Sequence, residues 1–509
     1  MSKELSRRDF LKLISACAVG SLAHGSLSPL GIQDGRPNVI IVLFDAMSAI
    51  HMSLHGYARE TTPHMSRLAD RATVYHNHYA AGNFTTSGTA SMLTGMFPWK
   101  HRAFNQGGLI RADLRQNNFY TLLGEGYERL AFSQNPWPDR LFSQFYHDVD
   151  RFLPITSYSL RGNKLVSDKI GQDRYLASLA FEEFLFTLNA DVMGSSVLGY
   201  LYKSTALDAI LSSRDQVGYP RGAPEIEGYT TYRNEDVYRG VFREIMSLEA
   251  AGGPYFAYFH LFSPHFPYKP GKKYWKLFQD GFEPPSKPAH PLSPQLAADD
   301  VLSKRTLYDQ QVAHVDAEFG ALMDRLEAEG VLENSYVIAT SDHGEMFERG
   351  FYGHGGVFLY EPVIKIPLLV FSPGQRRRQD VTTPTSNVDI LPTVLSLAGN
   401  DAPAILDGRL LPGLGGERDE QRPLFSIYAA QNSVFSPLQK AAIVMRKGAY
   451  KLIAYFGYPG LDNVYELYHL EGDPEELHSL VDDEPLVFSA LEEELLDHLA
   501  DANRPYQAG

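Results

Sequence analysis

Three segments of this 509-residue chain are continuous apolar runs, and polar residues follow each of them at once. They cover residues 38–44, 254–262 and 335–341. Apolar runs without alternation predict strands that are buried on both faces, as in a parallel sheet covered by helices. In open α/β sheets, ligands bind beyond the carboxyl ends of the strands. The sequence therefore predicts an α/β fold with a functional site at the carboxyl edge of its sheet.

The elements around these strands are predicted from their own patterns. Residues 308–326 carry apolar side chains at three- and four-residue steps, which predicts an amphipathic helix that ends near Gly330. We expect a buried strand at 366–371 and a helix at 388–398, kinked at Pro392. After residue 412, three short strand candidates predict a small antiparallel sheet. These candidates are residues 441–446, 450–456 and 464–470.

The chain is accordingly divided into a catalytic domain at residues 36–410 and a C-terminal subdomain at 411–509. Residues 150–245 are interpreted as a variable helical insertion in the catalytic domain. Within it, residues 175–211 are rich in Leu, Phe and Ala but also carry acidic side chains. A packed insertion is the first interpretation, and a lid or a membrane-facing surface are the alternatives.

The first 35 residues are interpreted as a signal peptide and linker. Arg7 and Arg8, with Phe10, Leu11 and Lys12 close behind, precede a modest apolar stretch, which resembles a twin-arginine export signal. We therefore expect the export machinery as a partner and a periplasmic or other extracytoplasmic location. The basic start of an ordinary helix is the alternative.

The only cysteine, Cys17, lies inside this signal, so the mature chain forms no disulfide. Residues 14–17 also resemble a lipobox, which leaves a lipid anchor at Cys17 as an alternative.

The charge balance excludes some partners. Lys and Arg number 46 against 61 Asp and Glu, a net charge of −15. A nucleic-acid-binding protein would normally carry a basic surface, so we expect no nucleic-acid partner. The mature part contains no uninterrupted apolar tract of about 18 residues, so no transmembrane helix is predicted there. Association with a membrane surface stays open.

Three places carry residues suited to chemistry. Asp45 ends the first strand, where an acid either binds a ligand or caps a turn. Thr85 lies where a hydroxyl-rich turn enters a predicted helix; unpaired N–H groups at a helix start favour anions, although an ordinary N-cap is the alternative. Asp342 and His343 are adjacent residues of metal-ligand type, followed by Gly344, which permits close backbone approach. Together they predict a site made of Asp, Thr, Asp and His.

Several short motifs then occur in one order along nearly the whole mature chain. They are Arg36-Pro37-Asn38, His55-Gly56-Tyr57 with Thr62-Pro63 and Leu68-Ala69, Leu93-Thr94-Gly95 with Pro98 and His101, Ser263-Pro264-His265-Phe266-Pro267-Tyr268, Ser341-Asp342-His343-Gly344, Tyr360-Glu361 with Ile366-Pro367-Leu368, Asp389-Ile390-Leu391-Pro392-Thr393, and Glu466-Leu467-Tyr468 with Asp473-Pro474-Glu475. In this order they resemble the sulfatase family of the alkaline phosphatase superfamily. The resemblance implies an alkaline phosphatase-like fold, in which helices sandwich a large mixed, mostly parallel sheet.

The departures from that family are informative. Thr85 stands where sulfatases carry the Cys or Ser that becomes formylglycine, with Ser87 and Thr89 at their Pro and Arg positions. A threonine there resembles instead the phosphoglycerol transferases, phosphoethanolamine transferases and nucleotide phosphodiesterases of the superfamily. Ala46 replaces the second acid of the first strand.

The remaining ligand set implied by the resemblance is Asp45, Thr85, Asp342 and His343, around one divalent metal ion. Calcium prefers six to eight oxygen ligands, so the lost carboxylate and the imidazole favour manganese or zinc, with calcium as the alternative.

The resemblance also implies roles. Thr85 would be the nucleophile, and His265 would contact the transferred group or protonate the leaving oxygen, with His354 as a second candidate. Thr89 would contact substrate. His260 is interpreted as structural or as a neighbour of the ligands.

We predict a metal-dependent hydrolase of phosphate or sulfate esters with a covalent Thr85 intermediate. Phosphoesters are favoured, because a threonine lacks the second hydroxyl with which formylglycine hydrate expels sulfate. The substrates would be small-molecule, glycan or lipid esters. The alternatives are a transferase acting on an envelope glycan or lipid, and a metal-binding protein without turnover.

Overall fold

The computed structural model describes residues 35–158, 218–226 and 230–507. By its contacts, Arg36–Gly509 is one compact unit. The signal, Cys17 and the predicted helices at 175–211 lie outside the described residues. The predicted boundary between residues 410 and 411 stays a prediction.

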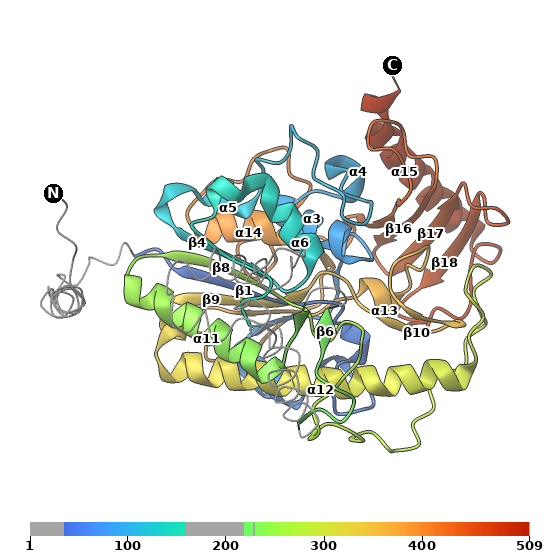
Figure 1. Ribbon diagram of the computed structural model, residues 1–509. Coiled ribbons are helices and arrows are strands. Elements are labelled where there is room, and N and C mark those ends of the chain that lie inside the picture. The colour runs from blue at the N-terminus through green and yellow to red at the C-terminus, as the bar shows by residue number, and fades with distance from the viewer. Residues whose placement is uncertain (1–34, 159–217, 227–229, 508–509) are drawn as a thin grey trace, which may run out of the picture. The chain divides into compact units, whose positions relative to one another are not determined.

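An eight-stranded mixed sheet forms the centre of this unit (Figure 1). Its strands, in spatial order, are β13 (Gln379–Val381), β2 (Thr73–Tyr75), β12 (Leu368–Phe371), β9 (Ser335–Ser341), β1 (Asn38–Phe44), β8 (Tyr255–Leu261), β4 (Glu128–Ser133) and β5 (Arg151–Leu153). The pairs from β9 through β5 are all parallel, and β12 runs antiparallel to both of its neighbours. The predicted mixed, mostly parallel sheet is confirmed.

Helices cover both faces of the sheet, which explains the continuous apolar runs. Alternate residues of β1 point to opposite faces: Ile40, Val42 and Phe44 join one core, and Val39 and Ile41 the other. On the first face lie α2 (Pro63–Leu68), α11 (Asn234–Ala251) and α12 (Ala298–Ala328). On the second face lie α3 (Thr85–Thr94), α5 (Phe119–Leu123), α6 (Pro136–Phe142) and α14 (Ile390–Leu397).

The C-terminal part forms the predicted antiparallel sheet. Its strands are β15 (Leu424–Tyr428), β16 (Ala441–Lys447), β17 (Tyr450–Phe456) and β18 (Val464–His469). The sequence prediction missed β15, and α15 (Pro485–Asn503) packs on this sheet through Leu491 and Leu495. The smaller elements are β3 (His78–Tyr79), α4 (Pro98–His101), β6 (Glu225–Ile226), β7 (Thr230–Thr231), β10 (Met346–Glu348), β11 (Phe351–Gly353), α13 (Glu361–Ile364) and β14 (Thr385–Ser386).

Pro392 does not interrupt the helix predicted at 388–398, which η9 (Asn387–Asp389) and α14 form together, and its predicted kink stays a prediction. Pro392 is the third residue of α14, in its first turn. Because N–H groups there have no partner within the helix, a proline removes no helical hydrogen bond. The predicted strand at 366–371 begins two residues later than expected, at Leu368.

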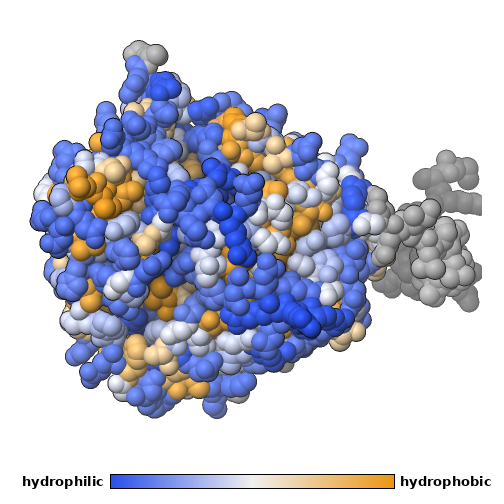
Figure 2. All heavy atoms as spheres, turned by 180° about the vertical axis from the view of Figure 1, so that it is seen from behind, coloured by the Kyte–Doolittle hydropathy of each residue, from blue (hydrophilic) through white to orange (hydrophobic). Residues whose placement is uncertain are grey.

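No helix in the described ranges combines the length and the hydropathy that a membrane span needs. The face in Figure 2 is largely hydrophilic, with its apolar residues in separate patches.

Candidate metal and catalytic site

The two acids of the predicted site meet because their strands are neighbours in register. Phe44 of β1 pairs with Ser341 of β9, so Asp45 and Asp342 leave the same edge of the sheet side by side. Both side chains are fully buried. Oδ1 of Asp45 and Oδ2 of Asp342 have no hydrogen-bond partner. Two buried carboxylate oxygens without donors indicate a place for a cation.

Helix α3 brings Thr85 to the same edge. Phe84 is its N-cap and offers no capping side chain. A Cβ added at Gly88 would lie 2.2 Å from the carbonyl oxygen of Asp342, so only a glycine allows the helix to come this close. As a result, Oγ1 of Thr85 lies 3.3 Å from Nε2 of His343.

The imidazole of His343 is oriented as a metal ligand. Its Nδ1–H donates to the carbonyl oxygen of Gly344 at 2.9 Å. The neutral ring therefore carries a free lone pair on Nε2. This atom lies 3.5 Å from Oδ1 of Asp45 and 3.5 Å from Oδ2 of Asp342.

The donor set fits one divalent ion. The ligand atoms of Asp45, Asp342 and His343 all lie within 4.8 Å of one another. Burial and the charge of Asp45 raise the pKa of Asp342 well above its usual range. Burial also raises the pKa of Asp45, but the imidazoles of His265, His260 and His343 outweigh this effect and lower it. Such a carboxylate pair is relieved of its mutual repulsion by a bound cation.

A second group of ligand-type residues, Glu235, His314 and Glu318, does not fit a metal. The backbone N–H of Gly271 donates to Nδ1 of His314 at 3.2 Å. The neutral ring then carries its proton on Nε2, which faces Glu235 at 3.6 Å and Glu318 at 3.9 Å. This nitrogen faces the carboxylates beyond hydrogen-bond distance, and with its proton in place it has no lone pair to offer a cation.

Two residues beside the acids complete the arrangement. Nδ2 of Asn135 donates to Oδ2 of Asp45 at 2.6 Å and lies 3.3 Å from Oγ1 of Thr85. Nε2 of His260 lies 3.2 Å from the same Asp45 oxygen. The sequence prediction missed Asn135 and interpreted His260 only as structural or as a neighbour. The available signal was their position at the ends of β4 and β8, the feature that singled out Asp45.

A cavity of about 970 Å³ opens above Thr85. Its walls are aromatic and amide side chains, with the predicted histidines among them. They include Phe84, Asn105, Gln106, Asn135, Trp137, His265, Phe266, Tyr352, His354, Tyr428 and Gln431. Among the described lining residues none is a lysine or an arginine.

The two predicted catalytic histidines lie next to each other in this cavity, with ring centroids 4.8 Å apart. Nδ1–H of His265 donates to the carbonyl oxygen of Phe266 at 2.6 Å, and burial lowers its pKa. Nδ1 of His354 lies 3.1 Å from Oε1 of Glu345. Burial lowers the pKa of His354, but the Glu345 carboxylate outweighs this and raises it. The pKa of His354 is therefore higher than that of His265.

Thr89, predicted to contact substrate, is fully buried and is not part of the cavity wall. It lies one helical turn beyond Thr85, and this turn carries it away from the open end of α3. The structure gives no support to its predicted role.

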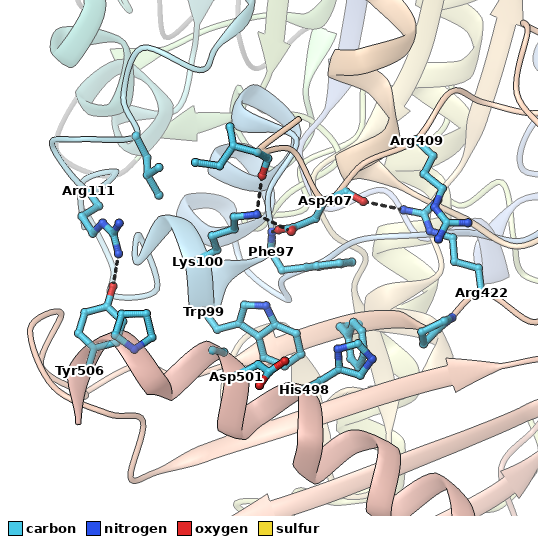
Figure 3. A pocket seen from close by; sticks show the side chains of 16 residues that line it. Phe97, Trp99, Lys100, Arg111, Asp407, Arg409, Arg422, His498, Asp501 and Tyr506 are labelled. Carbon is cyan, nitrogen blue, oxygen red and sulfur yellow. Dashed lines mark hydrogen bonds and ion pairs between the residues drawn. The ribbon is translucent and has the colours of Figure 1, made fainter. Parts of the chain in front are cut away.

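A separate cavity of about 480 Å³ lies beside α15 and contains none of the predicted site residues. Its cations already have partners (Figure 3). Lys100 binds Asp407 at 2.8 Å, and Arg111 donates to the hydroxyl of Tyr506 at 2.6 Å. Outside the view, Arg409 binds Asp419 at 3.0 Å. The larger cavity above Thr85 is therefore the candidate active site.

Comparisons with known proteins found similar families and a similar fold. A family model described as Sulfatase matches residues 37–400, and one described as N-sulphoglucosamine sulphohydrolase, C-terminal, matches residues 348–504. The choline-sulfatase of Rhizobium meliloti (strain 1021) is 24% identical over 480 residues, which cover 88% of this chain and 83% of that protein. The steryl-sulfatase of Rattus norvegicus is 24% identical over 440 residues, covering 75% of this chain and 70% of that protein.

Among solved structures, the phosphonate monoester hydrolase of Agrobacterium radiobacter superposes with a TM-score of 0.66. The match covers 92% of this chain and 96% of that chain, at 20% identity. At this identity the likeness shows a common fold, and it agrees with the predicted alkaline phosphatase-like architecture.

Proposed function

Because the chain belongs to the sulfatase family, as a hydrolase of sulfuric or phosphoric esters, we propose that it cleaves phosphoric or phosphonic esters through a covalent intermediate on Thr85. One observation carries this proposal. The Thr85 hydroxyl, at the uncapped start of α3, lies within 3.3 Å of both His343 and Asn135, beside two buried acids. A hydroxyl held there is suited to attack an anionic ester, whose oxygens the helix N-terminus stabilises.

The residues that would hold the metal are Asp45, Asp342, His343 and Thr85. Their set of two carboxylates, one imidazole and one hydroxyl favours manganese or zinc over calcium. When bound, a divalent ion supplies positive charge that lowers the pKa of the hydroxyl and offsets the charge of the phosphoryl oxygens.

In the first half-reaction, the Thr85 oxygen bonds to phosphorus and the bond from phosphorus to the leaving oxygen breaks. The hydroxyl proton passes to solvent, and His354 gives its proton to the leaving oxygen. The upward shift of the His354 pKa, caused by Glu345, supports this role as an acid.

In the second half-reaction, water bonds to phosphorus and the Thr85 oxygen leaves, regaining a proton from solvent. His265, whose Nε2 is free because Nδ1–H is bound to Phe266, takes the proton of that water. His265 then releases this proton to solvent, and His354 is recharged from solvent.

The residues that line the cavity are suited to bind a substrate whose leaving group is uncharged. Trp137, Phe266 and Tyr428 offer apolar faces, and Asn105, Gln106 and Gln431 offer amide hydrogen bonds. Aromatic alcohols and sugars match such walls. The phosphonate monoesters named for the similar hydrolase structure are therefore the first substrates to test, ahead of the sulfates named for the two relatives.

The test compares esters that share one leaving group. Purified protein, titrated with Mn²⁺, Zn²⁺ and Ca²⁺, would receive para-nitrophenyl phenylphosphonate, bis(para-nitrophenyl) phosphate and para-nitrophenyl sulfate. We expect many turnovers on the phosphorus esters, at most one slow turnover on the sulfate, and a mass increase on the peptide that contains Thr85. Repeated turnover of the sulfate at a higher rate than either phosphorus ester would disprove the proposed preference for phosphorus esters.

A transferase remains the second candidate, because water and an acceptor alcohol compete for the same intermediate. Adding glycerol to the same assay distinguishes the two. Formation of a glycerol ester in preference to the free acid would assign the protein to the transferases.

We also propose that the protein is exported by the twin-arginine route, because of Arg7 and Arg8. Replacing both by lysine should retain the precursor in the cytoplasm without changing its activity. Export of the double variant at the normal rate would exclude this route, and incorporation of labelled palmitate would assign the protein a lipid anchor at Cys17.

A further inference from the structure

Two buried side chains on β8 take no part in the two half-reactions described above. Tyr258 and His260 are both fully buried and, two residues apart on one strand, point to the same face of the sheet. His260 pairs in register with Leu43 of β1, which is two residues before Asp45. The pair therefore lies directly beneath the candidate metal ligands.

The hydrogen bonds between them have one consistent direction. Nε2 of His260 lies 3.2 Å from Oδ2 of Asp45, and Nδ1 lies 3.3 Å from the hydroxyl of Tyr258. An ionised carboxylate only accepts, so Nε2 must carry the proton and Nδ1 of the neutral ring must accept. Tyr258 is then the donor, and burial, which raises its pKa well above the usual value, keeps its hydroxyl protonated.

The two carboxylate oxygens of Asp45 differ in their hydrogen bonds. Oδ2 receives both His260 and Asn135, the latter at 2.6 Å. Oδ1 receives no hydrogen bond and lies 3.5 Å from Nε2 of His343. One carboxylate oxygen of Asp45 therefore accepts two hydrogen bonds from the protein, and the other is left without a hydrogen bond.

We propose that Tyr258 and His260 are positioning residues that hold Asp45 as a one-oxygen metal ligand. This inference rests on the metal assignment of the proposed function. It gives a reason why one acid would be enough where Ala46 follows Asp45: a single carboxylate, fixed by two donors, presents its free oxygen in one direction. Outer hydrogen bonds of this kind typically change metal affinity by about 10- to 100-fold.

The test uses the full-length protein loaded with Co²⁺, whose visible spectrum reports ligand geometry. Tyr258→Phe removes only the hydroxyl, His260→Leu removes the donor to Asp45, and His260→Gln restores an N–H near the position of Nε2. Tyr255→Phe is the matched control, because Tyr255 lies on the same strand but donates to Glu249, at 2.7 Å. Asp342→Ala serves as the test of the metal site itself.

We expect His260→Leu to weaken Co²⁺ binding by about 10- to 100-fold, Tyr258→Phe to change the Co²⁺ spectrum, and His260→Gln to recover most of the affinity. Tyr255→Phe should match the unmodified protein. If Asp342→Ala loses the metal while Tyr258→Phe and a folded His260→Leu keep normal affinity and spectrum, the positioning role is wrong and the metal site stands. If Asp342→Ala also keeps the metal, the metal assignment fails, and this inference fails with it.

Discussion

The hydroxyl oxygen of Thr85 lies 3.3 Å from Nε2 of His343, although 258 positions separate the two residues in the chain. One residue begins α3 and the other follows β9. Their meeting depends on how closely the helix approaches the edge of the sheet. The chemistry of the site is therefore sensitive to the packing of α3 as well as to the identity of its ligands.

Removing the Thr85 hydroxyl should abolish turnover, while the metal stays largely bound through Asp45, Asp342 and His343. Thr85→Ala is expected to lose activity on the phosphorus esters by roughly 10³-fold or more, because it lacks the nucleophile. Thr85→Ser keeps a hydroxyl and should retain measurable activity. Steady-state rates and elemental analysis of the purified variants check this. A Thr85→Ala protein with the normal rate would place the nucleophile elsewhere.

The pH dependence of the reaction should report the pair formed by His354 and Glu345. Because Glu345 raises the pKa of His354, the acid form persists to higher pH, and activity is lost as pH rises through that pKa. Glu345→Gln removes the charge, so the alkaline limb of kcat should move to lower pH. If the alkaline limb of the kcat–pH profile is unchanged in this variant, His354 is not the acid whose deprotonation produces that limb.

Gly88→Ala should damage the site although alanine normally stabilises a helix by about 1 kcal/mol relative to glycine. The new Cβ would lie 2.2 Å from the carbonyl oxygen of Asp342, so helix or loop must shift. We expect a lower melting temperature and weaker metal binding. If both quantities match those of the unmodified protein, the close approach of α3 to Asp342 is not needed.

Stability should fall as pH rises from about 4.5 to 7 because of Glu476. This buried carboxyl shares the single ammonium of Lys451 with Glu361, and burial raises its pKa to about 7. The folded state thus keeps a proton that the unfolded chain releases near pH 4.5. As the pH rises across this interval, the free energy of unfolding falls by on the order of 3 kcal/mol. Glu476→Gln should remove that loss.

The exposed Glu471 provides the control for this measurement. The free energy of unfolding, measured with urea at several pH values, is plotted against pH. Glu471→Gln and the unmodified protein should give parallel plots, and Glu476→Gln a flatter one. The same pH slope in all three proteins would assign it to other groups.

The sequence by itself determined the strands β1 and β9 and three of the four strands of the small antiparallel sheet, and it predicted the four residues Asp45, Thr85, Asp342 and His343 that the fold brings to one edge. Helices bury both faces of β1 and β9, so their composition is apolar throughout and can be read locally. Asp45, Asp342 and His343 follow such strands directly, and neighbouring parallel strands bring such residues together at one edge.

Only the tertiary structure decided how those ligands are held. Asn135 and His260 reach Asp45 from other strands, and the proton position on His343 depends on its bond to Gly344. It also placed Thr89 away from the cavity wall and Pro392 in the first turn of α14. Strand composition records burial, which is a local property. The direction of a hydrogen bond depends on atoms that folding brings together from distant parts of the chain. The local sequence pattern around one residue does not reveal which distant atoms will be its partners.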